Sequence, residues 1–279
     1  MATPSCFTEI QRSDFAPGLS VVIPAFNEAG RLPSTLQRIV EYLENRGSSY
    51  EIIVVDDGSH DETSGLVDAM AEQNQHIRLI SSASNRGKGA AVRRGMEAAK
   101  GEFRLFADAD GATPIEELAR LEAALDAGAD LAIGSRALAS RDQTYTVRAG
   151  RYRSTLGSLF NVLVQRLGVV GLSDTQCGFK LFRRTIARDL FSVSRVDGYA
   201  FDLELLYIAQ QRGYRIAEVP VNWADQPGSK VRPWRDGIVM LREFVHVRRR
   251  DAQGQYGVRY ETPTELINPS LSTAEPSQP

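Results

Sequence analysis

Apolar and polar positions follow two alternating patterns along the first half of the chain. Short β-branched or aromatic runs predict buried strands over 19–24, 51–55, 77–81, 103–107 and 131–134. Between these runs, apolar residues recur at helical spacing and predict helices over 31–46, 63–73, 90–99 and 114–127. The alternation predicts an α/β fold, with a doubly wound, mostly parallel sheet and helices on both of its faces.

After residue 135 the pattern changes. The stretch 141–170 begins rich in arginine and becomes amphipathic over 155–170. Helical spacing predicts two further C-terminal helices, over 200–212 and 235–250, of which the second is amphipathic. Residues 216–223 predict an edge strand, because Pro220 cannot donate a hydrogen bond to a neighbouring strand.

These patterns divide the chain into three parts. Residues 1–18 lack periodicity and predict a flexible leader. Residues 19–250 form one folded domain, whose two halves meet at residues 135 and 136. Residues 251–279 predict a disordered tail, rich in Pro, Ser and Thr from about residue 262.

The composition of the chain argues against several classes of protein. The 33 basic and 35 acidic residues give a net charge of -2, so the basic field of a nucleic-acid-binding protein is absent and no nucleic-acid partner is expected. The two cysteines, Cys6 and Cys177, exclude a disulfide framework and a cysteine zinc site, and a reducing cytosol is the expected location. No apolar run reaches the roughly 18 residues of a membrane span, and the N-terminus does not resemble a signal peptide.

Polar residues follow each of the first four predicted strands. They are Pro24-Ala25-Phe26-Asn27-Glu28, Asp56-Asp57-Gly58-Ser59, Asn85-Arg86-Gly87-Lys88-Gly89 and Asp108-Ala109-Asp110-Gly111. The carboxyl ends of parallel strands meet at one edge of a doubly wound sheet, where ligands bind. We therefore expect these four segments to form one site.

Asp108 and Asp110 carry the sharpest signal in that set. Two carboxylates one residue apart at a strand end can hold a divalent cation that bridges to a diphosphate, although a solvated turn uses the same residues. Asp56 and Asp57 suit a ribose hydroxyl or a base edge, or a simple Asp-Gly turn. The 85–89 loop suits an anionic ligand or a plain helix entry. No GxGxxG or GxxxxGK[ST] motif is present.

Four segments together resemble glycosyltransferase family 2, which has the GT-A fold: VVIPAFNE (21–28), VVDDGS (54–59), NRGKGAAVRRGM (85–96) and DADGAT (108–113). Later segments are similar to dolichyl-phosphate β-glucosyltransferases and, less closely, to dolichyl-phosphate mannose synthases. They are GSRA (134–137), DTQCGFKLF (174–182), FDLELLYIA (201–209) and EVPVNWADQPGSKV (218–231). The resemblance covers about residues 19–250 and makes 19–135 the nucleotide-binding half and 136–250 the acceptor half.

The resemblance implies an inverting, metal-dependent enzyme that moves glucose from UDP-glucose to dolichyl or another polyprenyl phosphate, giving a β-linked lipid-phosphate sugar. One alternative keeps the fold but uses GDP-mannose, another nucleotide sugar, or a hydroxyl acceptor. Another is a non-catalytic nucleotide-sugar- or lipid-binding protein. A nucleotidyltransferase is disfavoured, because the first loop is PAFNE and lacks the glycine- and arginine-rich sequence that those enzymes use.

The resemblance also assigns roles on the donor side. Residues at three places would bind the nucleotide sugar: Pro24, Ala25, Asn27 and Glu28; Asp56 or Asp57; and Lys88. Lys230, in a loop after Gly228, suits either added positive charge over the diphosphate or a solvated loop lysine. Asp108 and Asp110 would ligate Mg²⁺ or Mn²⁺, with Asp108 also facing the donor. Mannose synthases often add a glutamine ligand where this chain has Ala112.

On the acceptor side, arginines suit a lipid phosphate, because the guanidinium fork donates two parallel hydrogen bonds. The candidates are Arg136, Arg148, Arg151 and Arg153. The resemblance points to Arg153 by its spacing to Asn161, although Gly157 replaces a serine that mannose synthases carry; an exposed basic helix face is the alternative. Asp110, Asp202 and Arg136 are the expected catalytic residues, with Asp202 acting as general base if the acceptor is a hydroxyl and structurally otherwise.

A polyprenyl acceptor implies contact with a membrane. The stretches 155–170 and 238–250 suit either the membrane interface or packing against the sheet. The eukaryotic glucosyltransferases that the chain resembles carry an N-terminal membrane anchor, which is not seen here. We therefore expect a peripheral, cytoplasmic enzyme on the cytosolic face of the membrane; the sequence does not indicate an oligomeric state.

Overall fold

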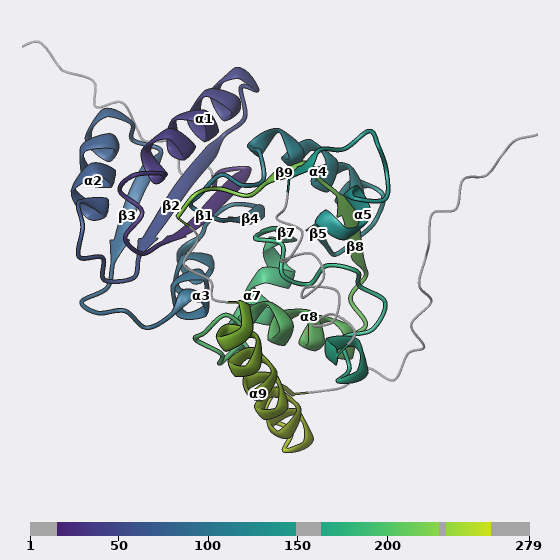
Figure 1. Cartoon of the computed structure of the whole chain (residues 1–279). Helices are drawn as coiled ribbons and strands as arrows, with labels where there is room; N and C mark the ends of the chain where they lie inside the picture. Colours follow the sequence, from purple (N-terminus) through teal and green to yellow (C-terminus); the bar gives the residue numbers. More distant parts are fainter. Residues whose placement is uncertain (1–15, 149–162, 229–232, 258–279) are drawn as a thin grey trace, which may run out of the picture.

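The structure is a computed structural model that describes residues 16–148, 163–228 and 233–257. It is built on one seven-stranded sheet in the order β3-β2-β1-β4-β7-β5-β8 (Figure 1). The strands are β1 (Leu19–Ala25), β2 (Tyr50–Asp56), β3 (Ile77–Ser81), β4 (Phe103–Ala107), β5 (Leu131–Ser135), β7 (Phe179–Arg183) and β8 (Ile216–Pro220). A separate two-stranded sheet pairs β6 (Val147–Arg148) with β9 (Trp223–Ala224).

Helices cover both faces of the main sheet, as predicted (Figure 1). One face carries α1 (Leu32–Asn45), α2 (Thr63–Gln73), the short 3-10 helix η1 (Ile115–Glu117) and α4 (Leu118–Asp126). The other carries α3 (Lys88–Ala98), α7 (Arg184–Val193), α8 (Phe201–Gln211) and α9 (Pro233–Ala252). A short helix, α5 (Arg136–Ala139), follows β5.

The alternation of side chains along the strands divides the core into two layers. On β1, Val22 faces the layer under α3 and α8, while Val21 and Ile23 face the layer under α1 and α4. All three side chains are fully buried, as expected for a parallel sheet with helices on both faces.

The alternating elements predicted before residue 135 are confirmed to within a few residues, except that the predicted helix over 114–127 divides into η1 and α4. Four elements were not predicted: α5, β6, β7 and the helix α7 that follows β7. β7 lies between β4 and β5 and runs antiparallel to both, which makes the sheet mostly, not wholly, parallel.

The second half also differs in its boundaries. The edge strand expected over 216–223 ends as β8 at Pro220, at the edge of the main sheet, and the chain then forms β9 in the small sheet. The predicted helices over 200–212 and 235–250 correspond to α8 and α9. Of the 155–170 stretch, residues 155–162 lie outside the described part of the chain, and Val164 and Val169 pack in the core.

The domain boundary expected at residue 250 lies inside α9. Beyond that helix, Tyr256 is buried and its hydroxyl donates to Glu204 Oε1 at 2.6 Å. The first residues of the expected 251–279 tail are therefore folded onto α8, while 258–279, like most of the expected leader, lie outside the described residues. Among the described helices, none is both long enough and apolar enough to cross a membrane.

Candidate active site

The loop after β1 is fixed by contacts to the loop after β2. Asn27 has a left-handed backbone with φ 53°; its amide N–H donates to Ser59 Oγ at 2.8 Å, and its side-chain oxygen accepts from the His60 N–H at 2.7 Å. The Glu28 N–H donates to Thr63 Oγ1 at 2.8 Å. Pro24 and Ala25 are the buried last residues of β1. The first two predicted segments therefore lie side by side.

Asp56 and Asp57 are both buried but hold different groups. The Asp56 carboxylate accepts hydrogen bonds from the hydroxyls of Ser59 and Ser64. The Asp57 carboxylate accepts from the backbone N–H groups of Arg86 and Gly87, at 2.9 and 2.7 Å. In this structure Asp57 therefore anchors the loop that leads into α3, a structural role that the sequence did not indicate.

That loop places Lys88 against the segment after β4. Lys88 Nζ lies 2.7 Å from Asp108 Oδ1. Burial works against the charge on Lys88, but the nearby carboxylates of Asp108 and Asp202 outweigh it and raise the pKa of the ammonium. The third and fourth predicted segments thus meet in an ion pair at the carboxyl edge of the sheet.

A glycine makes room for Asp108. A Cβ on Gly178 would lie 1.9 Å from Asp108 Oδ2, much closer than any real contact. The Asp108 N–H also donates to the Gly178 carbonyl oxygen at 3.0 Å. The DTQCGFK segment, which runs into β7, therefore packs its backbone directly against this carboxylate.

Asp110 lies at the mouth of the same site. Its Oδ1 accepts from the Ala112 N–H at 3.0 Å, and its Oδ2 lies 3.7 Å from Arg31 Nη1. Burial, followed by the neighbouring charge of Asp108, raises the pKa of Asp110. An open pocket of about 570 Å³ lies beside Asp108 and Asp110, lined also by Thr35, Arg38, Phe179 and Gln226.

Asp202 lies below this edge, in the first turn of α8. Its Oδ1 lies 2.6 Å from Lys180 Nζ, and both side chains are buried. Burial raises the pKa of Asp202, against the opposing charges of Lys180 and Lys88. The Lys180 ammonium also donates to the Cys177 carbonyl oxygen at 2.6 Å.

The donor set suits a hard divalent cation. Asp108 and Asp110 offer carboxylate oxygens, and Mg²⁺ is commonly held by one or two carboxylates together with water and substrate phosphates. The described residues contain no group of three or more His, Cys, Asp and Glu side chains that could enclose a metal ion. Asp108 and Asp110 would be the protein ligands of such a cation, and water and a diphosphate would complete its coordination.

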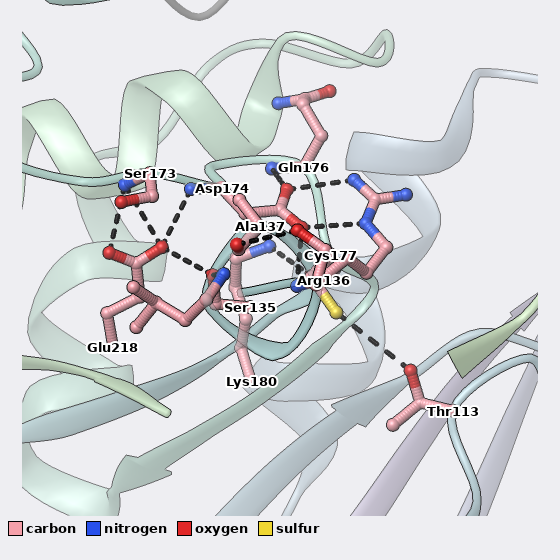
Figure 2. Close-up of polar contacts among 12 residues, drawn as sticks. Thr113, Ser135, Arg136, Ala137, Ser173, Asp174, Gln176, Cys177, Lys180 and Glu218 are labelled. Atoms are coloured by element: carbon pink, nitrogen blue, oxygen red, sulfur yellow. Dashed lines mark hydrogen bonds and ion pairs between the residues drawn. The ribbon is translucent and has the colours of Figure 1, made fainter. Parts of the chain in front are cut away.

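On the acceptor side, Arg136 is held by a chain of contacts that begins at Glu218 (Figure 2). Glu218 Oε1 accepts from the Ser135 hydroxyl at 2.6 Å and from the Asp174 N–H at 2.7 Å, and its Oε2 accepts from the Ser173 N–H at 2.9 Å. Asp174 then binds Arg136 through two parallel bonds, Nε to Oδ2 at 2.6 Å and Nη2 to Oδ1 at 2.8 Å.

These contacts set the charge state of the pair. Burial opposes ionisation of both groups, but the Arg136 guanidinium and its hydrogen bonds hold the pKa of Asp174 below its ordinary value. The Asp174 carboxylate in turn raises the pKa of Arg136. The Arg136 guanidinium also lies over the Trp223 ring, with its Cζ 5.3 Å from the ring centroid.

The remaining acceptor candidates are placed only in part. Arg148 is exposed on β6 in the small sheet. Arg151, Arg153 and Lys230 lie outside the described residues. Cys177 is fully buried, as expected for a packed residue, and burial followed by the charge of Asp174 raises its pKa to about 12.

Comparison with known proteins places the chain in a family. The model of the family described as "Glycosyl transferase family 2" matches residues 20–191. The chain belongs to glycosyl transferase family 2. Family 2 membership makes the protein a glycosyltransferase, and it confirms the resemblance carried by the four strand-end segments.

Two curated relatives within the family share one name. The chain is 40% identical over 254 residues to a dolichyl-phosphate beta-glucosyltransferase of Dictyostelium discoideum, covering 86% of this chain and 77% of that protein. It is also 40% identical over 254 residues to the Homo sapiens protein of the same name, covering 85% and 77%.

Solved structures agree on the fold. Glucosyl-3-phosphoglycerate synthase from Mycobacterium tuberculosis, solved with UDP, aligns with a TM-score of 0.61 and 21% identity over 88% of this chain and 82% of that one. Mannosyl-3-phosphoglycerate synthase from Rubrobacter xylanophilus aligns with a TM-score of 0.62 and 21% identity over 91% and 78%. The family 2 chain therefore has the GT-A fold predicted from its motifs.

Four residues that the structure places at the site are not among the candidates from the sequence: Arg31, Asp174, Lys180 and Glu218. The spacing of Glu28 and Arg31, three residues apart at a helix start, is a signal that could have found Arg31. A lysine in a short strand gives no comparable signal, because lysines are almost never fully buried.

Proposed function

We propose that this family 2 enzyme transfers glucose from UDP-glucose to dolichyl phosphate or another polyprenyl phosphate, with inversion and with a divalent cation. One observation carries the proposal: Asp108 and Asp110 line one open pocket at the carboxyl edge of the sheet, with Lys88 Nζ 2.7 Å from Asp108 and Arg31 Nη1 3.7 Å from Asp110, a set of charges that suits a divalent cation and a diphosphate. The names of the curated relatives support glucose as the sugar and dolichyl phosphate as the acceptor.

On the donor side, we propose that Asp108 and Asp110 hold Mg²⁺ or Mn²⁺, which would neutralise the negative charge that develops on the leaving diphosphate. The enzyme from M. tuberculosis has been solved with Mn²⁺ and UDP-glucose on the same fold. The proposal for this chain rests on its own two carboxylates. Asn27, Glu28 and Asp56 or Asp57 would bind the nucleoside, with Lys88 and Lys230 on the phosphates.

On the acceptor side, a phosphate oxygen is already anionic and needs no general base. The oxygen would attack the anomeric carbon opposite the UDP, forming the new C–O bond as the bond to the β-phosphate oxygen breaks. Arg136 would orient the phosphate, because Asp174 fixes the guanidinium in one position. Asp202 is paired with Lys180 in the interior, which supports a positioning role and not proton abstraction.

We further propose that α9 lies on a membrane surface at the cytosolic face. Three of its apolar side chains are exposed: Ile238 at 67%, Val239 at 47% and Val245 at 37%. Arg242, Arg248 and Arg249 are exposed on the same helix. Apolar side chains flanked by arginines suit a surface of acyl chains and lipid phosphates.

A radiolabelled transfer assay tests the function. UDP-glucose, GDP-mannose and UDP-N-acetylglucosamine would each be offered with polyprenyl phosphate in detergent, with Mn²⁺, with Mg²⁺ or with a chelator. Lipid-extractable label from UDP-glucose that requires the cation supports the proposal, and an Asp110→Asn variant should lose it. Label transferred from another donor would show that the proposed sugar is wrong. Hydrolysis of the donor without a lipid product would show that the proposed lipid acceptor is wrong.

A further inference from the structure

Arg31, at the start of α1, joins three segments of the donor edge through one guanidinium. Its Nε and Nη2 donate to the two carboxylate oxygens of Glu28, at 2.7 and 2.6 Å. Its Nη1 donates to the Pro227 carbonyl oxygen at 3.2 Å and lies 3.7 Å from Asp110 Oδ2. The β1 loop, the 226–228 segment and the candidate metal ligand therefore share this cation.

Lys88 stands in the same relation to the other candidate ligand, with its Nζ 2.7 Å from Asp108 Oδ1. Each of the two carboxylates proposed to hold a divalent cation therefore already has a cationic side chain beside it. A divalent cation that binds between these carboxylates must share them with the two side chains or displace them, because like charges at this range repel.

The donor brings the complementary charge. A nucleoside diphosphate is anionic, and guanidinium and ammonium groups bind its oxygens with charge-assisted hydrogen bonds. Arg31 is suited to such an exchange, because its contacts to Glu28 and Pro227 use three of its five N–H groups. Glu28 would hold the guanidinium beside the site while its contact changes from Asp110 to a phosphate oxygen.

We propose that the side chains of Arg31 and Lys88 neutralise Asp110 and Asp108 in the absence of a divalent metal ion. A bound metal ion would displace these two side chains onto the diphosphate of the donor, so that metal ion and donor bind cooperatively. The inference rests on the proposed donor and cation. It adds Arg31 to the donor site as a diphosphate-binding residue and predicts how the two ligands depend on each other.

The test measures binding to the full chain without turnover. Binding of Mn²⁺ alone is followed by the electron paramagnetic resonance signal of the free ion. Binding of UDP is followed by calorimetry with and without saturating Mn²⁺, and the ratio of the two UDP affinities is the coupling factor, which linkage makes equal in both directions. For the unmodified protein we expect a coupling factor of at least about tenfold.

Arg31→Gln removes the resident charge from Asp110. We expect Mn²⁺ alone to bind about threefold more tightly, a modest gain because both side chains of the pair are partly exposed, at 22% and 24%. The UDP coupling factor should fall by about fivefold, because the variant has no guanidinium that could move from Asp110 to the diphosphate. Arg31→Lys, which keeps the charge but loses the fork, should lie between the two.

Arg46→Gln is the matched control. Arg46 caps the other end of α1, as Arg31 caps its start, and its guanidinium likewise pairs with a carboxylate, at 2.7 Å from Glu122 Oε2. Its substitution should change neither the Mn²⁺ affinity nor the coupling factor. Thermal melting of each variant would show that the fold is kept, and Arg31→Lys carries the test if Arg31→Gln unfolds.

Two results would overturn the inference, and they differ in what else they affect. If the unmodified chain binds UDP and Mn²⁺ but Arg31→Gln and Arg31→Lys leave the Mn²⁺ affinity and the coupling factor unchanged, Arg31 has only a structural role and the proposed function stands. If the unmodified chain binds neither UDP nor Mn²⁺, the proposed donor and cation are wrong, and the inference is wrong with them.

Discussion

Lys180 and Asp202 form an ion pair inside the protein, with Nζ 2.6 Å from Oδ1 and side-chain exposures of only 1% and 5%. Lys180 belongs to the antiparallel strand β7, and Asp202 to the first turn of α8. The ring of Phe106 on β4 lies close to this pair and to Lys88, with Lys180 Nζ 5.8 Å and Lys88 Nζ 5.3 Å from its centroid. The pair therefore lies near Lys88 and the candidate site.

Breaking this pair should destabilise the fold. Lys180→Met and Asp202→Asn each leave a buried charge without its partner, and we expect each to lower the free energy of unfolding by about 3–5 kcal/mol. The double variant should lose less than the sum of the two single losses, because it leaves no uncompensated charge. Urea denaturation measures all three values, and strictly additive losses would show that the two groups do not interact.

The same pair shows where prediction from sequence ends. Because the carboxyl ends of parallel strands meet at one edge of a sheet, the sequence predicted that Asp57, Lys88 and Asp108 lie at the same edge. The structure places them there. Strand β7 was not predicted, because FKLFR is five residues long and carries two basic side chains. Its place between β4 and β5 depends on pairing between residues 47 or more positions apart in the chain, which a local sequence pattern does not report.

The sequence also did not predict which charged side chains pair with each other. Asp174 was not among the candidate residues from the sequence, and its two bonds to Arg136 became visible only in three dimensions. Arg31 and Glu218 are separated from their partners by turns and strands whose geometry sets the contact. Residue types at strand ends thus predicted which segments meet at one edge of the sheet, whereas the pairing of their charges required the folded chain.

Gly178→Ala should abolish most activity while keeping the fold. The added Cβ would lie 1.9 Å from Asp108 Oδ2, so the carboxylate must turn away from its present position. A catalytic group displaced by about 1 Å costs on the order of a hundredfold in rate, and we expect a loss of at least that size in the transfer assay.

The control is Gly65→Ala in α2, where the nearest atom to an added Cβ would be Glu62 Oε2 at 3.6 Å. This substitution should leave the rate unchanged and stabilise the helix by about 0.5–1 kcal/mol. If Gly178→Ala were as active as the unmodified enzyme, the position of Asp108 would not matter for the reaction.

Cys177 should be unreactive in the folded protein. Burial and the charge of Asp174 raise the pKa of its thiol to about 12, and the thiolate is the reactive form. In a Cys6→Ser background, alkylation at pH 8 should be at least about a thousandfold slower than in urea, where the thiol has its ordinary pKa of about 8.5. Because the folded pKa is raised, the folded-state rate should rise about tenfold per pH unit between pH 8 and 10.

Mass spectrometry of the alkylated protein measures both rates. A folded-state rate that levels off near pH 9 would mean that the thiol titrates at its ordinary pKa and that the interior around Asp174 is open to water.

Glu218 should control the acceptor without touching it. Its carboxylate accepts hydrogen bonds from Ser135 and Asp174 and so fixes the Asp174 carboxylate that holds Arg136. Glu218→Gln replaces one acceptor oxygen with an NH₂ group that faces backbone N–H donors. We expect the KM for polyprenyl phosphate to rise about tenfold, while the KM for UDP-glucose stays within about twofold, because one misplaced hydrogen bond costs about 1–1.5 kcal/mol.

Glu51→Gln separates this effect from a general loss of stability. Glu51 also accepts several hydrogen bonds, from the Ser20 hydroxyl at 2.6 Å and the Lys100 N–H at 2.6 Å, but it lies near the start of β2, at the opposite edge of the sheet from the candidate site. Both variants should lower the melting temperature, and only Glu218→Gln should raise the acceptor KM. Equal acceptor KM values in the two variants would show that Glu218 does not influence acceptor binding through Arg136. Asp174 would then be the only member of that chain of contacts that positions Arg136.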